Sequence, residues 1–92
     1  MRLMLRFSIP VERGNQVQAD DSLSSVLQSL VEQLKPEAAY FHLHDGKRAG
    51  TIVFEETEQS KLAIVNESLF EHCHAAIDIQ PVLNLDDLTK AL

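Results

Sequence analysis

Hydrophobic and polar residues alternate at the start of the chain as they do in a strand that is half-buried in a sheet. In "LMLRFSI", residues 3–9, the odd positions are all leucine, phenylalanine or isoleucine, so one face is apolar. Pro10 lacks the N–H that a sheet ladder needs, and we expect the strand to end there. Residues 11–20 are mainly polar, and they predict a connection with at most a short helical turn in "NQVQA".

Helical spacing of apolar residues predicts three helices further along. Residues 21–35 carry apolar side chains every three or four positions, and Pro36 marks the end of this helix. Thr57 is placed to cap a second helix through "EQSKLAIVNES". The final "NLDDLTKAL" predicts a short helix capped near Asn84.

A hairpin is predicted where "AAYFHLH" and "RAGTIVFE" flank Asp45-Gly46, because a type I′ turn needs positive φ at both central residues. A last strand follows in "CHAAIDIQPV". The hairpin register would pair His44 with Lys47, His42 with Ala49, Phe41 with Gly50 and Tyr40 with Thr51. Its core face would carry Ala39, Phe41, Leu43, Ile52 and Phe54.

The order strand, helix, strand, strand, helix, strand predicts an α+β, ferredoxin-like βαββαβ domain. Its antiparallel sheet has the spatial order 4-1-3-2, with both helices on one face. Residues 1–92 form a single domain. A chain this short has a small core, which a partner subunit would extend.

The sheet face away from the helices has a mixed character. A fully solvated face is richer in lysine and glutamate, whereas a half-apolar face is typical of an interface or a binding surface. We therefore expect two protomers to bring these faces together. The predicted face comprises Met4, Arg6, Ser8, Tyr40, His42, His44, Thr51, Val53, His74, Ala76 and Asp78.

The strand order, the short length, Leu69-Phe70 before the last strand and "IDIQPVLNLDDL" at residues 77–88 resemble the dimeric α/β-barrel superfamily. The most similar branches are muconolactone isomerase-like proteins and small uncharacterised bacterial members. The resemblance implies a homodimer whose two sheets close into a barrel around a cavity. The superfamily includes isomerases, cofactor-independent monooxygenases and haem-handling proteins. No catalytic motif of one branch matches residue by residue, so no catalytic role is carried over.

Composition limits the classes of binding partner and the cellular compartment that we expect for this protein. A net charge of −6 argues against nucleic acid or an anionic membrane surface as a partner. The single cysteine, Cys73, excludes an internal disulfide and is typical of a reducing compartment. No apolar stretch approaches the roughly 18 residues of a membrane helix. Arg6 interrupts the apolar start, so we interpret it as a strand and not as a secretion signal, and expect a cytoplasmic protein.

The first functional hypothesis is a cavity that binds a small organic molecule and isomerises or oxidises it. Arg6 would hold a carboxylate or enolate by charge-assisted hydrogen bonds. His42 would move protons at neutral pH, and Tyr40 or Asp78 would orient it or share the transfer. The glycines lack the spacing of a dinucleotide fingerprint, and we expect no cofactor.

Three other readings fit the same residues. Arg6 and Asp78 would serve equally well as an ion pair between subunits. His42 and His44 of one chain, with His72 and His74 of another, would suit a metal site shared across the dimer, whereas strands at opposite sheet edges of one chain lie roughly 14 Å apart. A non-catalytic module that only binds or self-associates would need none of this chemistry.

Overall fold

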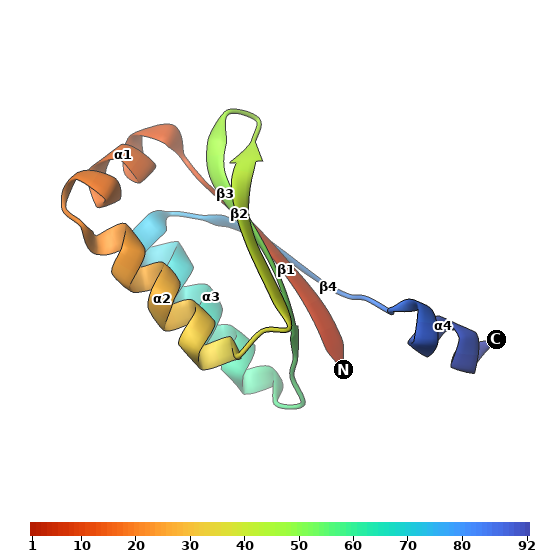
Figure 1. Cartoon of the computed structure of the whole chain (residues 1–92). Helices are drawn as coiled ribbons and strands as arrows, with labels where there is room; N and C mark the ends of the chain where they lie inside the picture. Colours follow the sequence, from red (N-terminus) through yellow and green to blue (C-terminus); the bar gives the residue numbers. More distant parts are fainter.

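The computed structural model describes all of residues 1–92, which adopt an α+β fold with a four-stranded sheet. The sheet order is β2-β3-β1-β4 with every neighbouring pair antiparallel, which is the predicted 4-1-3-2 order read from the other edge. Figure 1 shows α1, α2 and α3 on one side of the sheet. The elements are β1 (Arg2–Ile9), α1 (Val11–Ala19), α2 (Ser22–Leu34), β2 (Ala38–His44), β3 (Lys47–Glu55), α3 (Gln59–Cys73), β4 (Ala76–Pro81) and α4 (Leu85–Ala91).

The β2–β3 hairpin forms as its turn residues require. Asp45 and Gly46 have φ angles of 52° and 75°, both in the left-handed region that a type I′ turn needs. All four predicted cross-strand pairs are present, including His42 with Ala49 and Tyr40 with Thr51. The turn therefore sets which side chains of β2 point away from the helices.

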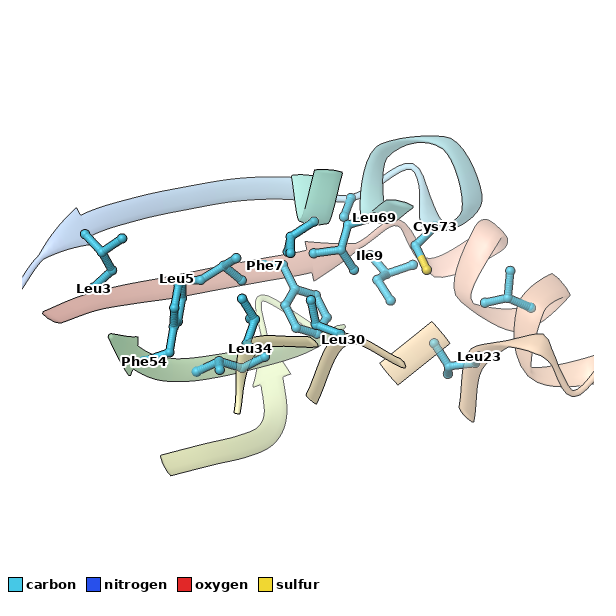
Figure 2. Close-up of a cluster of buried hydrophobic side chains, with 14 residues drawn as sticks. Leu3, Leu5, Phe7, Ile9, Leu23, Leu30, Leu34, Phe54, Leu69 and Cys73 are labelled. Atoms are coloured by element: carbon cyan, nitrogen blue, oxygen red, sulfur yellow. The ribbon is translucent and has the colours of Figure 1, made fainter. Parts of the chain in front are cut away.

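The core lies between the central strands and the helices. The apolar face of β1 is buried along its whole length, and Phe54 of β3 is fully buried beside it. Figure 2 shows these side chains converging with Leu30 and Leu34 of α2 and Leu69 of α3. Burying apolar surface of this kind is the main favourable term in folding. This layer leaves the opposite face of the sheet uncovered by α1, α2 or α3, and we call that side the open face.

Two helix predictions need correction. Residues 11–20 contain a nine-residue helix, α1, where a connection was expected. Its sequence is polar on nearly every side, so it lacks the apolar stripe that identifies a helix, and only Gly14 and Val17 are buried. The second predicted helix, α3, begins after Glu58 with no side-chain cap, so Thr57 does not cap it, and it continues to Cys73.

The outer part of β2 also differs from the expectation. Phe41 and Leu43 lie on the helix side of the sheet, but they are 51% and 74% exposed. The buried core cluster consists of side chains from β1, β3, the helices and Ala75, which precedes β4. From β2, only Ala39 packs against this cluster. As an edge strand, β2 extends beyond the cover that the helices provide.

Candidate functional site

The register of the sheet arranges the open face in rows that run across all four strands. One row consists of Tyr40, Thr51, Arg6 and Asp78, taken from β2, β3, β1 and β4 in that order. The next row consists of His42, Ala49, Ser8 and Ala76. The first row is polar, and the second has small side chains at its centre. Small residues beside larger ones leave a hollow on the sheet.

A depression of about 290 Å³ lies over this second row. Its volume is at the small end of the range for ligand pockets. Three of the four predicted site residues, Arg6, His42 and Asp78, line this depression. Its lining is Arg6, Phe7, Ser8, His42, His44, Ala49, Gly50, Thr51, Ala76, Ile77 and Asp78.

His42 is fixed by hydrogen bonds at both ring nitrogens. Nδ1 lies 3.1 Å from the carbonyl oxygen of Leu43, and Nε2 lies 2.8 Å from the hydroxyl of Thr51. A carbonyl only accepts, so Nδ1 carries a proton and donates it, and Nε2 of the neutral ring accepts from the Thr51 hydroxyl. The ring therefore presents its basic nitrogen toward the centre of the open face.

Arg6 and Asp78 form an ion pair within one chain, with 3.6 Å between Nη2 and Oδ2. The two side chains are 55% and 63% exposed. Exposed pairs of this kind contribute about 0–1 kcal/mol, so Asp78 holds the guanidinium only weakly. The guanidinium N–H groups of Arg6 make no hydrogen bond within the chain, since the contact with Asp78 is longer than a hydrogen bond. Arg6 is thus placed to bind a carboxylate through its free, forked donors.

Within the chain, neither Tyr40 nor Asp78 forms a hydrogen bond with His42. Asp78 is on the opposite edge strand from His42, three strand spacings or roughly 14 Å away, and it pairs with Arg6. Tyr40 is on the open face but is 68% exposed and lies outside the depression. The orienting groups are Thr51 and the Leu43 carbonyl. Thr51 is predicted on this face but with no role, because its hydrogen bond to His42, nine residues away in the sequence, depends on the pairing of β2 with β3.

The histidines near β4 do not lie on that strand, as the shared metal site would require, but at the end of α3. His72 belongs to α3, and His74 ends that helix with φ of 55°, in the left-handed conformation common at helix C-termini. Because α3 runs to Cys73, β4 begins only at Ala76. No group of three or more His, Cys, Asp or Glu side chains has a metal-binding arrangement. His44 lies beside Asp45, 3.4 Å away, at the exposed hairpin end.

A second polar cluster joins the ends of α1, α2 and α3. The Ser22 hydroxyl donates to Asp20 at 2.5 Å, and His72 Nε2 lies 2.6 Å from the same hydroxyl oxygen. Arg13 donates to the His72 carbonyl at 2.7 Å. The hydrogen bonds from Ser22 hold the pKa of Asp20 below its usual range. Because Ser22 gives its proton to Asp20 and not to His72, the cluster is a link between helices and not an activated nucleophile.

The open four-stranded antiparallel sheet with its helix layer on one face defines a small α+β domain consistent with the ferredoxin-like arrangement. No protein-family model and no curated protein matches the chain. A solved structure described as "De novo designed protein Ferredog-Diesel" is similar, with a TM-score of 0.55 and 10% identity over 88% of this chain and 85% of that chain. At this identity the likeness concerns the fold alone. None of the helices is long and apolar enough to cross a membrane.

Proposed function

We propose that this protein is a homodimer whose two open faces meet and enclose a cavity that binds a small organic acid. The observation that carries the proposal is the position of Arg6. Its guanidinium is on the open face at the border of the 290 Å³ depression and is held only by one exposed carboxylate. Enclosure between two sheets would lower the local dielectric and strengthen its attraction for a carboxylate.

His42, across the depression from Arg6, would supply the group that transfers protons. His42 sits two strands from Arg6, a separation of roughly 10 Å, which leaves room for a small molecule between them. Nε2 accepts a hydrogen bond from the Thr51 hydroxyl when the ring is neutral and donates one to it when the ring is protonated. The ring can therefore keep its orientation while it takes up and releases a proton. Proton abstraction next to a carbonyl, as in an isomerase, or handling of an electron-rich substrate for oxidation is the chemistry that this pair would serve.

A dimer is supported by the charge distribution of the open face. The chain carries −6 in total, but the strands of this face hold three cationic side chains and two anionic ones, and one of the cations, Arg2, pairs with Glu37 and Asp87. Two acidic chains can therefore approach each other through this surface without bringing their excess negative charge together. The charged residues are Arg2, Arg6, Lys47, Glu55 and Asp78.

The experiment is a titration of ¹⁵N-labelled protein with benzoate and with the uncharged benzamide, followed by NMR. Benzoate should shift the amides of Ser8, Thr51 and Ala76, and benzamide should bind much more weakly. Loss of charge-assisted hydrogen bonds costs about 1.5–3 kcal/mol, so Arg6→Met should weaken benzoate binding roughly 10- to 100-fold.

Arg48→Met is the matched control, because Arg48 is on β3 but on the helix side of the sheet, where it donates to Asn15 at 3.0 Å. It should leave benzoate binding unchanged. Equal binding of benzoate by wild type and Arg6→Met, or equal binding of benzoate and benzamide, would contradict the proposal.

The second candidate is a self-associating module without chemistry. It is favoured by the exposed apolar residues at the C-terminal end, which suit protein contacts and have no place in a reaction. A dimer that shows no response to benzoate or to other small carboxylates would favour this candidate.

A further inference from the structure

The C-terminal helix α4 and the residues that flank it carry an apolar stripe that is largely exposed. Leu85, Leu88 and Leu92 follow helical spacing, and Leu83 precedes them. Their exposed fractions are 76%, 42% and 94%, and that of Leu83 is 64%. No residue of α4 is buried. Four exposed leucines gathered in ten residues form an apolar patch of the kind that often marks an interaction site.

The direction of α4 is set by specific contacts. The Val82 N–H donates to the Arg2 carbonyl at 3.0 Å, which continues the pairing of the last strand. Asn84 and Asp87 form a capping box at the helix start. The Arg2 guanidinium, which also donates to Glu37 at 2.5 Å, forms an ion pair with Asp87. The helix is therefore preorganised, and a partner would not have to order it on binding.

α4 lies on the open side of the sheet, away from the other helices (Figure 1). This projection makes the molecule 48 Å long, and its radius of gyration of 14.0 Å exceeds the roughly 12 Å expected for a compact chain of this length. A second protein laid over the open face would consequently meet α4. We infer that the leucine stripe of α4 packs against the open face of a second copy of this chain, so that each subunit's α4 covers one end of the shared cavity.

Interface area supports a second copy as the occupant. Four strands at about 4.8 Å and six paired residues at about 3.3 Å give the sheet face a footprint of only about 400 Å². A stable interface buries about 800 Å² on each partner. At roughly 100 Å² of apolar surface per leucine, the four exposed leucines add on the order of 300 Å². By two-fold symmetry both partners contribute the same surfaces, so each would bury roughly 700 Å², close to what a stable interface needs.

The test measures the dimer dissociation constant by sedimentation equilibrium. Leu85→Ser/Leu88→Ser should raise this constant at least about 100-fold, because each subunit would lose the burial of two leucine side chains at the interface. These leucines contribute to no core, so the variant should keep the wild-type circular dichroism and thermal midpoint. Ile64→Ser is the matched control, since Ile64 is 63% exposed on α3, behind the sheet. It should leave the dimer unchanged.

This inference rests on the proposed homodimer, and Val53→Lys on the open face of β3 separates the two claims. Weaker dimers from both the α4 variant and Val53→Lys support the inference. A dimer weakened by Val53→Lys but unaffected by the α4 variant overturns the inference and leaves the homodimer standing. A dimer weakened by neither variant, or wild-type protein that stays monomeric at tens of micromolar, overturns both and assigns α4 to a different partner.

Discussion

Gly50 provides the sharpest test of the packing behind the open face. It pairs with Phe7 across the central strands, and a Cβ at this position would lie 2.5 Å from Phe7 Cε1, 2.7 Å from Cζ and 3.2 Å from Phe41 Cδ1. Phe7 is only 4% exposed, so its ring has little room to move. Gly50→Ala should therefore destabilise the protein, although alanine normally favours a strand over glycine.

The expected size follows from two opposing effects. Overpacking a core costs about 1–3 kcal/mol, and replacing a strand glycine by alanine recovers about 0.5–1 kcal/mol. The net loss should be roughly 1–2 kcal/mol, which for a domain of this size lowers the thermal midpoint by about 5–15 °C. Urea unfolding followed by circular dichroism measures this change, with an unchanged m-value as evidence that both states keep their compactness.

Phe7→Leu supplies the control, because the smaller side chain makes room for the added methyl. In that background Gly50→Ala should cost nothing or stabilise slightly, giving a coupling of at least about 1 kcal/mol between the two sites. Equal costs of Gly50→Ala in the two backgrounds would refute the steric explanation.

Two predictions concern titratable groups outside the open face. The pKa of Asp20 is lowered by hydrogen bonds from Ser22, so its contribution to stability is complete above its ordinary value of 3.8 and is lost as the pH falls through the lower folded-state pKa. The thermal midpoint of wild type should thus fall more between pH 6 and pH 3 than that of Asp20→Asn, and parallel curves would contradict this. Burial raises the pKa of the Cys73 thiol, which is fully inaccessible. Dithionitrobenzoate should label it only as fast as the protein unfolds, and rapid labelling of the folded protein would show that the thiol is accessible.

The strand pairing could be read from the sequence because local chemistry determines it. Asp45-Gly46 specifies one turn geometry, and that turn fixes the register of every pair in the hairpin. In β1, the alternation of apolar and polar residues identified the buried face, because successive side chains of a strand point to opposite faces. Arg6 and His42 consequently lie on the predicted face, and both line the depression.

Other features depend on contacts that no local pattern contains. α1 has no apolar stripe, so its helix is stabilised by docking Val17 and not by its own periodicity. The β4 boundary was misplaced because alternation in "CHAAIDI" continues into the end of α3, where His74 takes the left-handed conformation. The role of Thr51 depends on cross-strand pairing with β2, and the direction of α4 depends on Arg2, 85 residues away from Asp87.

The central claim is that two open faces meet around a shared cavity, and a native mass spectrum of the purified protein tests it most directly. The account predicts a species at twice the 10.3 kDa mass of the chain, with benzoate adding one molecule per cavity to wild type and not to Arg6→Met. A monomer that persists at tens of micromolar would leave the open face exposed to water and contradict the claim.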